Sequence, residues 1–216
     1  MRYKVALFDL DGCITASAPG IIRCIKETLD ESGVKYNPED LNKMIGPPFR
    51  ESMRLYCGLE SEETEQFIIG YRARYNEYGW KMFDVYEGIP ELLKTLHENG
   101  VIVALATSKP ERFAKMMIEK ANLTQYFDFI GGALSDKSRD KKKDVILYVL
   151  DELKIKDKSQ VIMIGDRCYD IEGARECGLD TIAVLWGYGN IDEFKEHKAK
   201  YICEKPMDVA KLILDI

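Results

Sequence analysis

Two aspartates at the end of an apolar run have the spacing that chemistry could use. Residues 5–15 of this 216-residue chain read VALFDLDGCIT, so Asp9 and Asp11 stand two positions apart. Where the backbone is still extended, side chains at i and i+2 point to the same face. Such a pair of carboxylates could form a reactive site. The same pair could equally be a solvated turn, so the other polar segments must decide.

Further polar residues gather in three later segments. They are TSK at 107–109, KKK at 141–143 and GDRCYD at 165–170. Each follows a strand-like apolar run or precedes a helical pattern. In an open parallel sheet the reactive crevice lies outside the carboxyl ends of the strands. Acids, hydroxyls and lysines from separate parts of the chain are therefore expected to converge on one crevice.

The elements that must position these residues follow an alternating order. Short apolar runs predict six buried strands, at 3–8, 101–106, 127–132, 161–164, 181–186 and 201–203. Helical patterns lie between them, such as the one at 145–153. This alternation is typical of right-handed crossovers, which build a parallel sheet with helices on both faces. We therefore expect an α/β fold with a Rossmann-like parallel-sheet core.

Residues 15–84 interrupt this order. They contain several helical patterns and no strand-like run, which predicts an inserted α-helical domain within a core made of 1–14 and 85–216. Four aromatic residues of this insert recur at helical spacing, and we expect them to fill its own core: Phe67, Tyr71, Tyr75 and Tyr78.

Charge and composition narrow the classes of partner. The net charge of −6 argues against nucleic acid, which usually binds to a basic face. No apolar stretch approaches the roughly 18 residues of a membrane span, so no membrane partner is expected. Six cysteines without a C-x-x-C pair and an N-terminus unlike a signal peptide predict a cytoplasmic protein. A monomer or homodimer is expected. The P-loop and G-x-S-x-G patterns are both absent.

The polar segments together resemble a known family. The signatures D-x-D-G, a hydroxyl, a lysine and G-D-x-x-x-D occur in the order found in haloacid dehalogenase-like phosphatases. The chain is most similar to the branch of phosphoglycolate phosphatases and 5′-nucleotidases, in which a helical cap follows the first signature. The match covers nearly the whole chain, and its strongest stretches are FDLDG, ATSKP, MIGDRCYDIEGA and VLWGYG. The resemblance implies hydrolysis of a small phosphorylated metabolite.

The resemblance also implies catalytic roles. Asp9 matches the nucleophile that forms an aspartyl-phosphate, and Asp11 matches the general acid and base. Thr107 and Lys142 match the groups that hold and neutralise the phosphate, as phosphoryl transfer requires, with Ser108 as a further substrate-binding residue. Three consecutive lysines leave the lysine assignment open, and a charge run is often only a solvated face. The spacing R-x-x-K-x-x-V-I favours Lys142.

Carboxylates that face a phosphate need a cation between them. Oxygen ligands without a histidine cluster favour Mg²⁺. By resemblance, its ligands are Asp9, the backbone carbonyl of Asp11, Asp166 and Asp170. Asp170 also suits the N-cap of the following helix. In the insert, Arg50 of segment 45–53 is either a contact for a second anionic group of the substrate or an ordinary helix-surface charge.

Three other functions remain compatible with the sequence. A phosphosugar mutase uses the same aspartyl-phosphate, and a phospho-accepting signalling domain also combines acids, a hydroxyl and a lysine. A binding protein without activity would retain every polar signature by coincidence. The substrate and any motion of the cap are not visible in the sequence, because the insert that selects the substrate is its least interpretable part.

Overall fold

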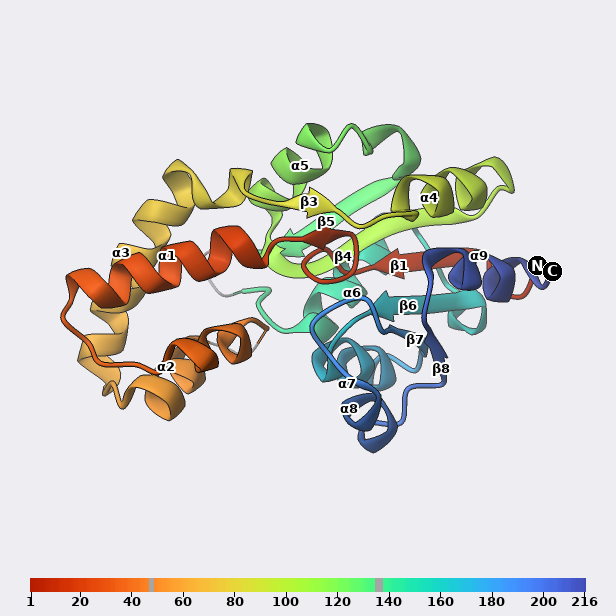
Figure 1. The fold of residues 1–216 in the computed structure, drawn as a ribbon. Helices are drawn as coiled ribbons and strands as arrows, with labels where there is room; N and C mark the ends of the chain where they lie inside the picture. Colours follow the sequence, from red (N-terminus) through yellow and green to blue (C-terminus); the bar gives the residue numbers. More distant parts are fainter. Residues whose placement is uncertain (47–48, 135–137) are drawn as a thin grey trace. The chain divides into compact units, whose positions relative to one another are not determined.

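The computed structural model describes residues 1–46, 49–134 and 138–216, and these form two compact units. Met1–Ala16 and Val85–Ile216 make the core unit, and Ser17–Asp84 make the helical unit (Figure 1). Within these ranges, no helix combines the length and the apolar character needed to cross a membrane.

The core unit is built on a six-stranded sheet in the order β5-β4-β1-β6-β7-β8, and every neighbouring pair is parallel (Figure 1). The strands are β1 (Val5–Phe8), β4 (Ile102–Pro110), β5 (Phe129–Ala133), β6 (Val161–Gly165), β7 (Asp180–Val184) and β8 (Tyr201–Cys203). The α/β fold with a parallel sheet, predicted from the sequence, is therefore confirmed. In register, Phe8 lies between Leu105 of β4 and Ile164 of β6.

Each of these strands coincides with a predicted apolar run. All four residues of β1 and all five of β6 are buried, because both faces of a parallel sheet are covered and its strands read as continuous apolar runs. The difference lies in β4, which continues to Pro110 instead of ending at residue 106. Its pairing with β5 shifts between Thr107 and Pro110. The residues at this end of the strand are polar, so the apolar pattern did not include them.

Helices cover both faces of the sheet. On one face, α6 (Lys142–Glu152) and α7 (Cys168–Glu176) pack against alternate strand residues such as Leu7 and Met163. On the other side, α4 (Ile89–Glu98) packs against β4 and α9 (Pro206–Leu214), which also contacts β8. The remaining elements of the unit are α5 (Glu111–Lys120), α8 (Ile191–Glu196) and the 3₁₀ helices Thr124–Tyr126 and Lys158–Gln160.

The two ends of the chain lie close together in the core unit (Figure 1). The backbone N–H of Arg2 donates to the carbonyl of Ile213 over 2.8 Å.

Helix α6 begins at Lys142, three positions earlier than its apolar pattern suggested, because its first turn is polar and Lys141 before it is extended.

In its described residues, the helical unit contains three α-helices, α1 (Ala18–Glu31), α2 (Phe49–Cys57) and α3 (Ser61–Glu77), of which α1 and α2 both pack against α3. Two 3₁₀ helices, Pro38–Met44 and Gly79–Lys81, complete it. The predicted aromatic core is confirmed for Phe67, Tyr71 and Tyr75, which are buried. Tyr78 is only half-buried, and its hydroxyl donates to Glu27.

Two very short strands contradict the expectation that residues 15–84 hold no strand. They are β2 (Thr15–Ala16) and β3 (Asp84–Val85), which form a two-stranded sheet where the chain passes between the units. Two residues are too few to produce the alternation by which a strand is recognised in sequence.

The packing of α6 is tested by two leucines of the same helix. Leu150 is 3% exposed and packs in the core cluster under the sheet, whereas Leu147 is 39% exposed. We expect Leu150→Ala to lower the free energy of unfolding by about 2–5 kcal/mol, because it leaves a cavity. Leu147→Ala should lower it by less than about 1 kcal/mol. Urea unfolding followed by circular dichroism measures both, and equal losses would mean that the orientation of α6 is wrong.

Candidate active site

The polar residues meet at the carboxyl ends of β1 and β6, which are neighbours in the centre of the sheet. Asp9 directly follows β1, and its backbone N–H donates to Ile164 of β6 over 2.9 Å. Asp166 directly follows β6 and is fully buried. Adjacent parallel strands that end together therefore bring the two carboxylates side by side.

Three carboxylates form a cluster with the dimensions of a cation site. Asp9, Asp166 and Asp170 each offer one oxygen, and these oxygens all lie within 4.8 Å of one another. Burial, together with the negative charges of Asp170 and Asp9, raises the pKa of Asp166 well above its usual range. Among the residues that the structure describes, Oδ1 of Asp166 has no hydrogen-bond partner. A divalent cation would satisfy this oxygen and offset the repulsion, so the cluster fits a metal.

Lys142 holds two of these carboxylates. Its Nζ lies 2.8 Å from Oδ1 of Asp9 and 2.7 Å from Oδ1 of Asp170, and it donates to the carbonyl of Ala106 over 3.0 Å. Burial lowers the pKa of Lys142, but the charges of Asp170 and Asp9 outweigh this effect and raise the pKa above its ordinary value. The ammonium is therefore charged. Of the three consecutive lysines, the structure places Lys142 in the cluster, leaves Lys141 exposed and leaves Lys143 half-buried.

The glycine of D-x-D-G allows the loop after β1 to close. Gly12 has φ +85°, a left-handed conformation that other residues rarely adopt. A Cβ at this position would lie 2.1 Å from Oδ2 of Asp166. The N–H of Gly12 donates to Thr15 over 2.8 Å, so the chain turns back immediately beside the buried carboxylate.

The end of β4 supplies the hydroxyl segment. Thr107 is buried and its Oγ1 accepts from the N–H of Lys109 over 3.2 Å, whereas Ser108 is exposed. The side chain of Lys109 is 5% exposed, and its Nζ lies 2.6 Å from Oδ2 of Asp11. No role was expected for Lys109 from the sequence. Its place two residues after Thr107 indicates a shared face only where a strand is regular, and the pairing of β4 with β5 shifts at this point.

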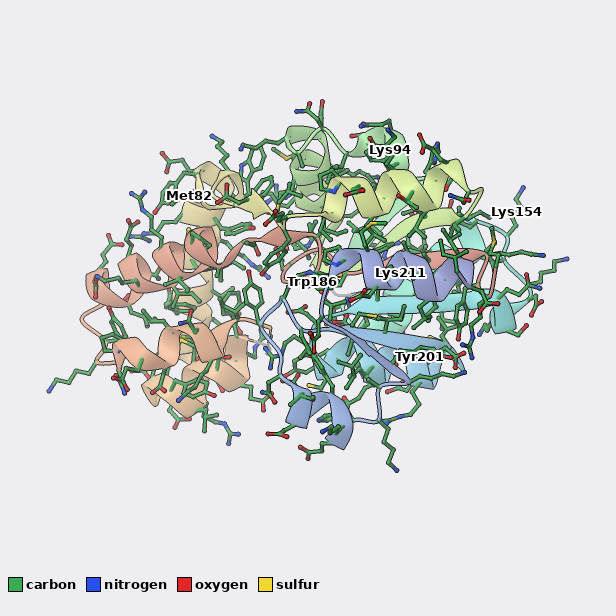
Figure 2. All side chains as sticks on the ribbon, turned by 45° about the vertical axis from the view of Figure 1, so that its right-hand side comes forward. Met82, Lys94, Lys154, Trp186, Tyr201 and Lys211 are labelled. Atoms are coloured by element: carbon green, nitrogen blue, oxygen red, sulfur yellow. The ribbon has the colours of Figure 1, made fainter. Side chains whose placement is uncertain are left out.

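The loop after β7 also contacts the site, although no role was expected for it from the sequence. The indole N–H of Trp186 donates to the carbonyl of Cys13 over 2.9 Å (Figure 2). The N–H of Tyr188 donates to Oδ2 of Asp166 over 2.7 Å. The indole of Trp186 therefore contacts the loop that follows β1, while the backbone N–H of Tyr188 satisfies one oxygen of Asp166. Each of these contacts involves a backbone group, so residue type gives little indication of it.

One expectation about an individual residue changes, and Arg50 fits one of its two alternatives, a helix-surface charge. Asp170 is not the N-cap of α7. The N-cap is Arg167, and Asp170 is the third residue of the helix, where its Oδ2 accepts from the N–H of Arg167 over 3.1 Å. Arg50 belongs to the helical unit. Its side chain is 55% exposed, and its Nε donates to Glu65 of α3 over 2.8 Å. Residues 47 and 48 of segment 45–53 lie outside the described residues.

The chain is similar to proteins of known family. A family model described as "Haloacid dehalogenase-like hydrolase" matches residues 6–184. The chain is 39% identical over 190 residues to "Tyrosine-protein kinase PtkA" of Mycobacterium tuberculosis, an alignment that covers 88% of this chain and 64% of that protein. The chain thus spans less than two thirds of the length of this relative.

Two further similarities extend over whole chains. A "5'-nucleotidase" of Pseudomonas aeruginosa is 32% identical over 206 residues, which cover 94% of this chain and 92% of that protein. The crystal structure of a "predicted phosphatase" from Clostridium acetobutylicum matches with a TM-score of 0.92 and 37% identity, and covers 100% of both chains.

Two neighbouring lysines of α6 test whether Lys142 stabilises the buried carboxylates. Lys142→Met should lower the free energy of unfolding by roughly 3–5 kcal/mol, because it leaves buried carboxylates without their cation. Lys143→Met removes a lysine whose side chain is 43% exposed and whose Nζ lies 3.3 Å from Glu176, and it should change the free energy of unfolding little. Urea unfolding in the absence of divalent cations makes the comparison. A Lys142→Met variant as stable as Lys143→Met would contradict this stabilising role of Lys142.

Proposed function

Because the chain belongs to the haloacid dehalogenase-like hydrolase family, we propose that it is a magnesium-dependent phosphatase. Its substrate is a small phosphomonoester of the phosphoglycolate or nucleoside monophosphate class. The observation that carries this proposal is the position of Asp9, whose carboxylate follows β1, pairs with Lys142 and lies beside the buried carboxylates Asp166 and Asp170. A nucleophilic carboxylate needs neighbouring cations that aim it and reduce its repulsion from phosphate.

Asp9 and Asp11 divide the reaction between them. An oxygen of Asp9 attacks phosphorus, the bond from phosphorus to the leaving oxygen breaks, and that oxygen takes a proton from the carboxyl of Asp11. Water then attacks the phosphorus of the aspartyl-phosphate and gives a proton back to Asp11. The bond between phosphorus and Asp9 breaks, and inorganic phosphate leaves. The side chain of Asp11 is 22% exposed, so its carboxyl group is accessible for both proton transfers.

The other site residues of the core unit would bind the metal ion and neutralise the charge of the phosphate. Asp9, Asp166 and Asp170, with the backbone carbonyl of Asp11, are the groups that would hold Mg²⁺. When bound, Mg²⁺ would draw charge from the phosphoryl oxygens. Lys142 and the Thr107 hydroxyl would contact the equatorial oxygens, and Ser108 would add a further donor. The helical unit would act as the cap that selects the leaving group, with Arg50 available for a second anionic group if it left Glu65.

A second candidate is transfer of the phosphoryl group to an acceptor other than water. The relative named as a tyrosine-protein kinase favours it, at 39% identity over most of this chain. The same aspartyl-phosphate would serve, with an alcohol or phenol replacing water in the second step, as in a phosphosugar mutase. No P-loop pattern occurs in the sequence, so a kinase reaction would have to bind its nucleotide by another route.

Phosphate release from a panel of phosphorylated metabolites tests the proposal. The native chain should turn over at least one monoester with Mg²⁺ and lose that activity when the metal is chelated. Asp9→Asn should lower kcat by about 10³-fold or more, because the amide is a poor nucleophile. Asp208→Asn alters a half-exposed aspartate of α9 and serves as the matched control.

The same assay separates the alternatives. An Asp9→Asn variant that keeps its activity would overturn the assigned nucleophile. If the native chain releases no phosphate but moves the phosphoryl group to a sugar phosphate or a tyrosine-containing peptide, the phosphatase is wrong and the transferase is right. If it does neither, both functions fail.

A further inference from the structure

A second buried lysine stands beside the active-site carboxylates. Lys109 Nζ lies 2.6 Å from Oδ2 of Asp11, and only 5% of the Lys109 side chain is exposed. The two residues are 98 positions apart in the chain. Lys142 contacts Asp9 and Asp170, so each aspartate of the D-x-D pair has its own ammonium. Burying an ammonium costs free energy unless it is paired, and the fold accepts this cost twice at one site.

The local backbone is arranged to bring Lys109 inward. The pairing of β4 with β5 passes from Thr107↔Gly132 directly to Pro110↔Ala133, so Ser108 and Lys109 form a bulge. β-Bulges commonly re-aim a side chain beside an active site. A Cβ on Gly132 would lie 2.6 Å from the carbonyl oxygen of Lys109, so the bulge requires glycine opposite it. The position of Lys109 therefore depends on two strands, not on one flexible side chain.

The contact fixes the orientation of the Asp11 carboxyl group. Oδ2 faces Lys109. Oδ1 is buried and has no hydrogen-bond partner among the described residues. The ion pair on Oδ2 therefore sets the rotation of the carboxyl group.

We propose that Lys109 is a positioning residue, which orients the Asp11 carboxyl for proton transfer to the leaving oxygen. This inference rests on the proposed function. Lys109 acts through Asp11 and not on the phosphate, and this distinguishes it from Lys142. As the bond from phosphorus to the leaving oxygen breaks, the O–H bond of Asp11 breaks and a new O–H bond forms on the departing alcohol. Lys109 gains and loses no proton.

The inference predicts a dependence on the leaving group. An alkyl alkoxide is a poor leaving group and needs its proton during bond cleavage, whereas p-nitrophenolate leaves without one. Removing Lys109 should therefore slow hydrolysis of an alkyl monoester far more than hydrolysis of p-nitrophenyl phosphate. A lysine that served only the stability of the fold would affect both substrates equally.

The test measures kcat and KM for both substrates in Lys109→Met, Lys109→Arg and Lys94→Met. For Lys109→Met we expect kcat to fall roughly 100-fold on the alkyl monoester and less than about tenfold on p-nitrophenyl phosphate, with KM nearly unchanged. Lys109→Arg should restore part of the loss. Lys94 is an exposed lysine of α4 (Figure 2), so Lys94→Met is the matched control and should behave as the native chain.

A double-mutant cycle with Asp11→Asn completes the test. Once Asp11 is an amide, Lys109→Met should cause less than about a twofold further loss, because its partner no longer transfers a proton. The double variant also carries no unpaired buried charge from this pair, so it guards against a variant that fails to fold.

Each outcome bears on one claim. Equal losses on both substrates, or losses that multiply with those of Asp11→Asn, would overturn the positioning role and place Lys109 on the phosphate or in the fold. Hydrolysis of p-nitrophenyl phosphate that requires Asp9 would leave the phosphatase intact in that case. If the native chain hydrolyses neither substrate, the proposed function fails and the role of Lys109 fails with it.

Discussion

Repulsion among carboxylates is the constraint on which the rest of this structure depends. Asp9, Asp166 and Asp170 place oxygens within 4.8 Å of one another, and the last two are buried. Such a cluster is stable only with positive charge beside it. Lys142 supplies part of that charge from the first turn of α6, and Lys109 supplies more to Asp11 from the end of β4. Four carboxylates against two ammonium groups still leave an excess of negative charge, which suits a divalent cation.

The topology of the sheet brings these charged residues together. β1 lies between β4 and β6, so residues that follow three adjacent strands meet at one edge although they are far apart in the chain. Glycines then allow the loops to close over the cluster, since a Cβ at Gly12 would collide with Asp166. The carboxylates and lysines of this cluster therefore all come from the core unit.

Much of this could be predicted from the sequence, for a physical reason. Buried parallel strands must be apolar on both faces, so the runs at 3–8 and 161–164 predicted β1 and β6, and the aspartates that follow them stood out at once. Lys142 could be singled out from its neighbours only by family spacing, and the geometry shows the reason: α6 starts there and turns that side chain inward. The role of Lys109 depends on a bulge and on a glycine of another strand, and pattern reading along one segment does not detect such a pairing.

The central claim is that Asp9 carries the phosphoryl group during turnover. Acid quenching during steady-state turnover, followed by borohydride reduction and peptide mass spectrometry, tests it directly, because reduction converts an aspartyl-phosphate to homoserine. The account predicts homoserine at position 9, only when substrate and Mg²⁺ are both present. Turnover with Asp9 unmodified, or with the modification on another residue, would contradict it.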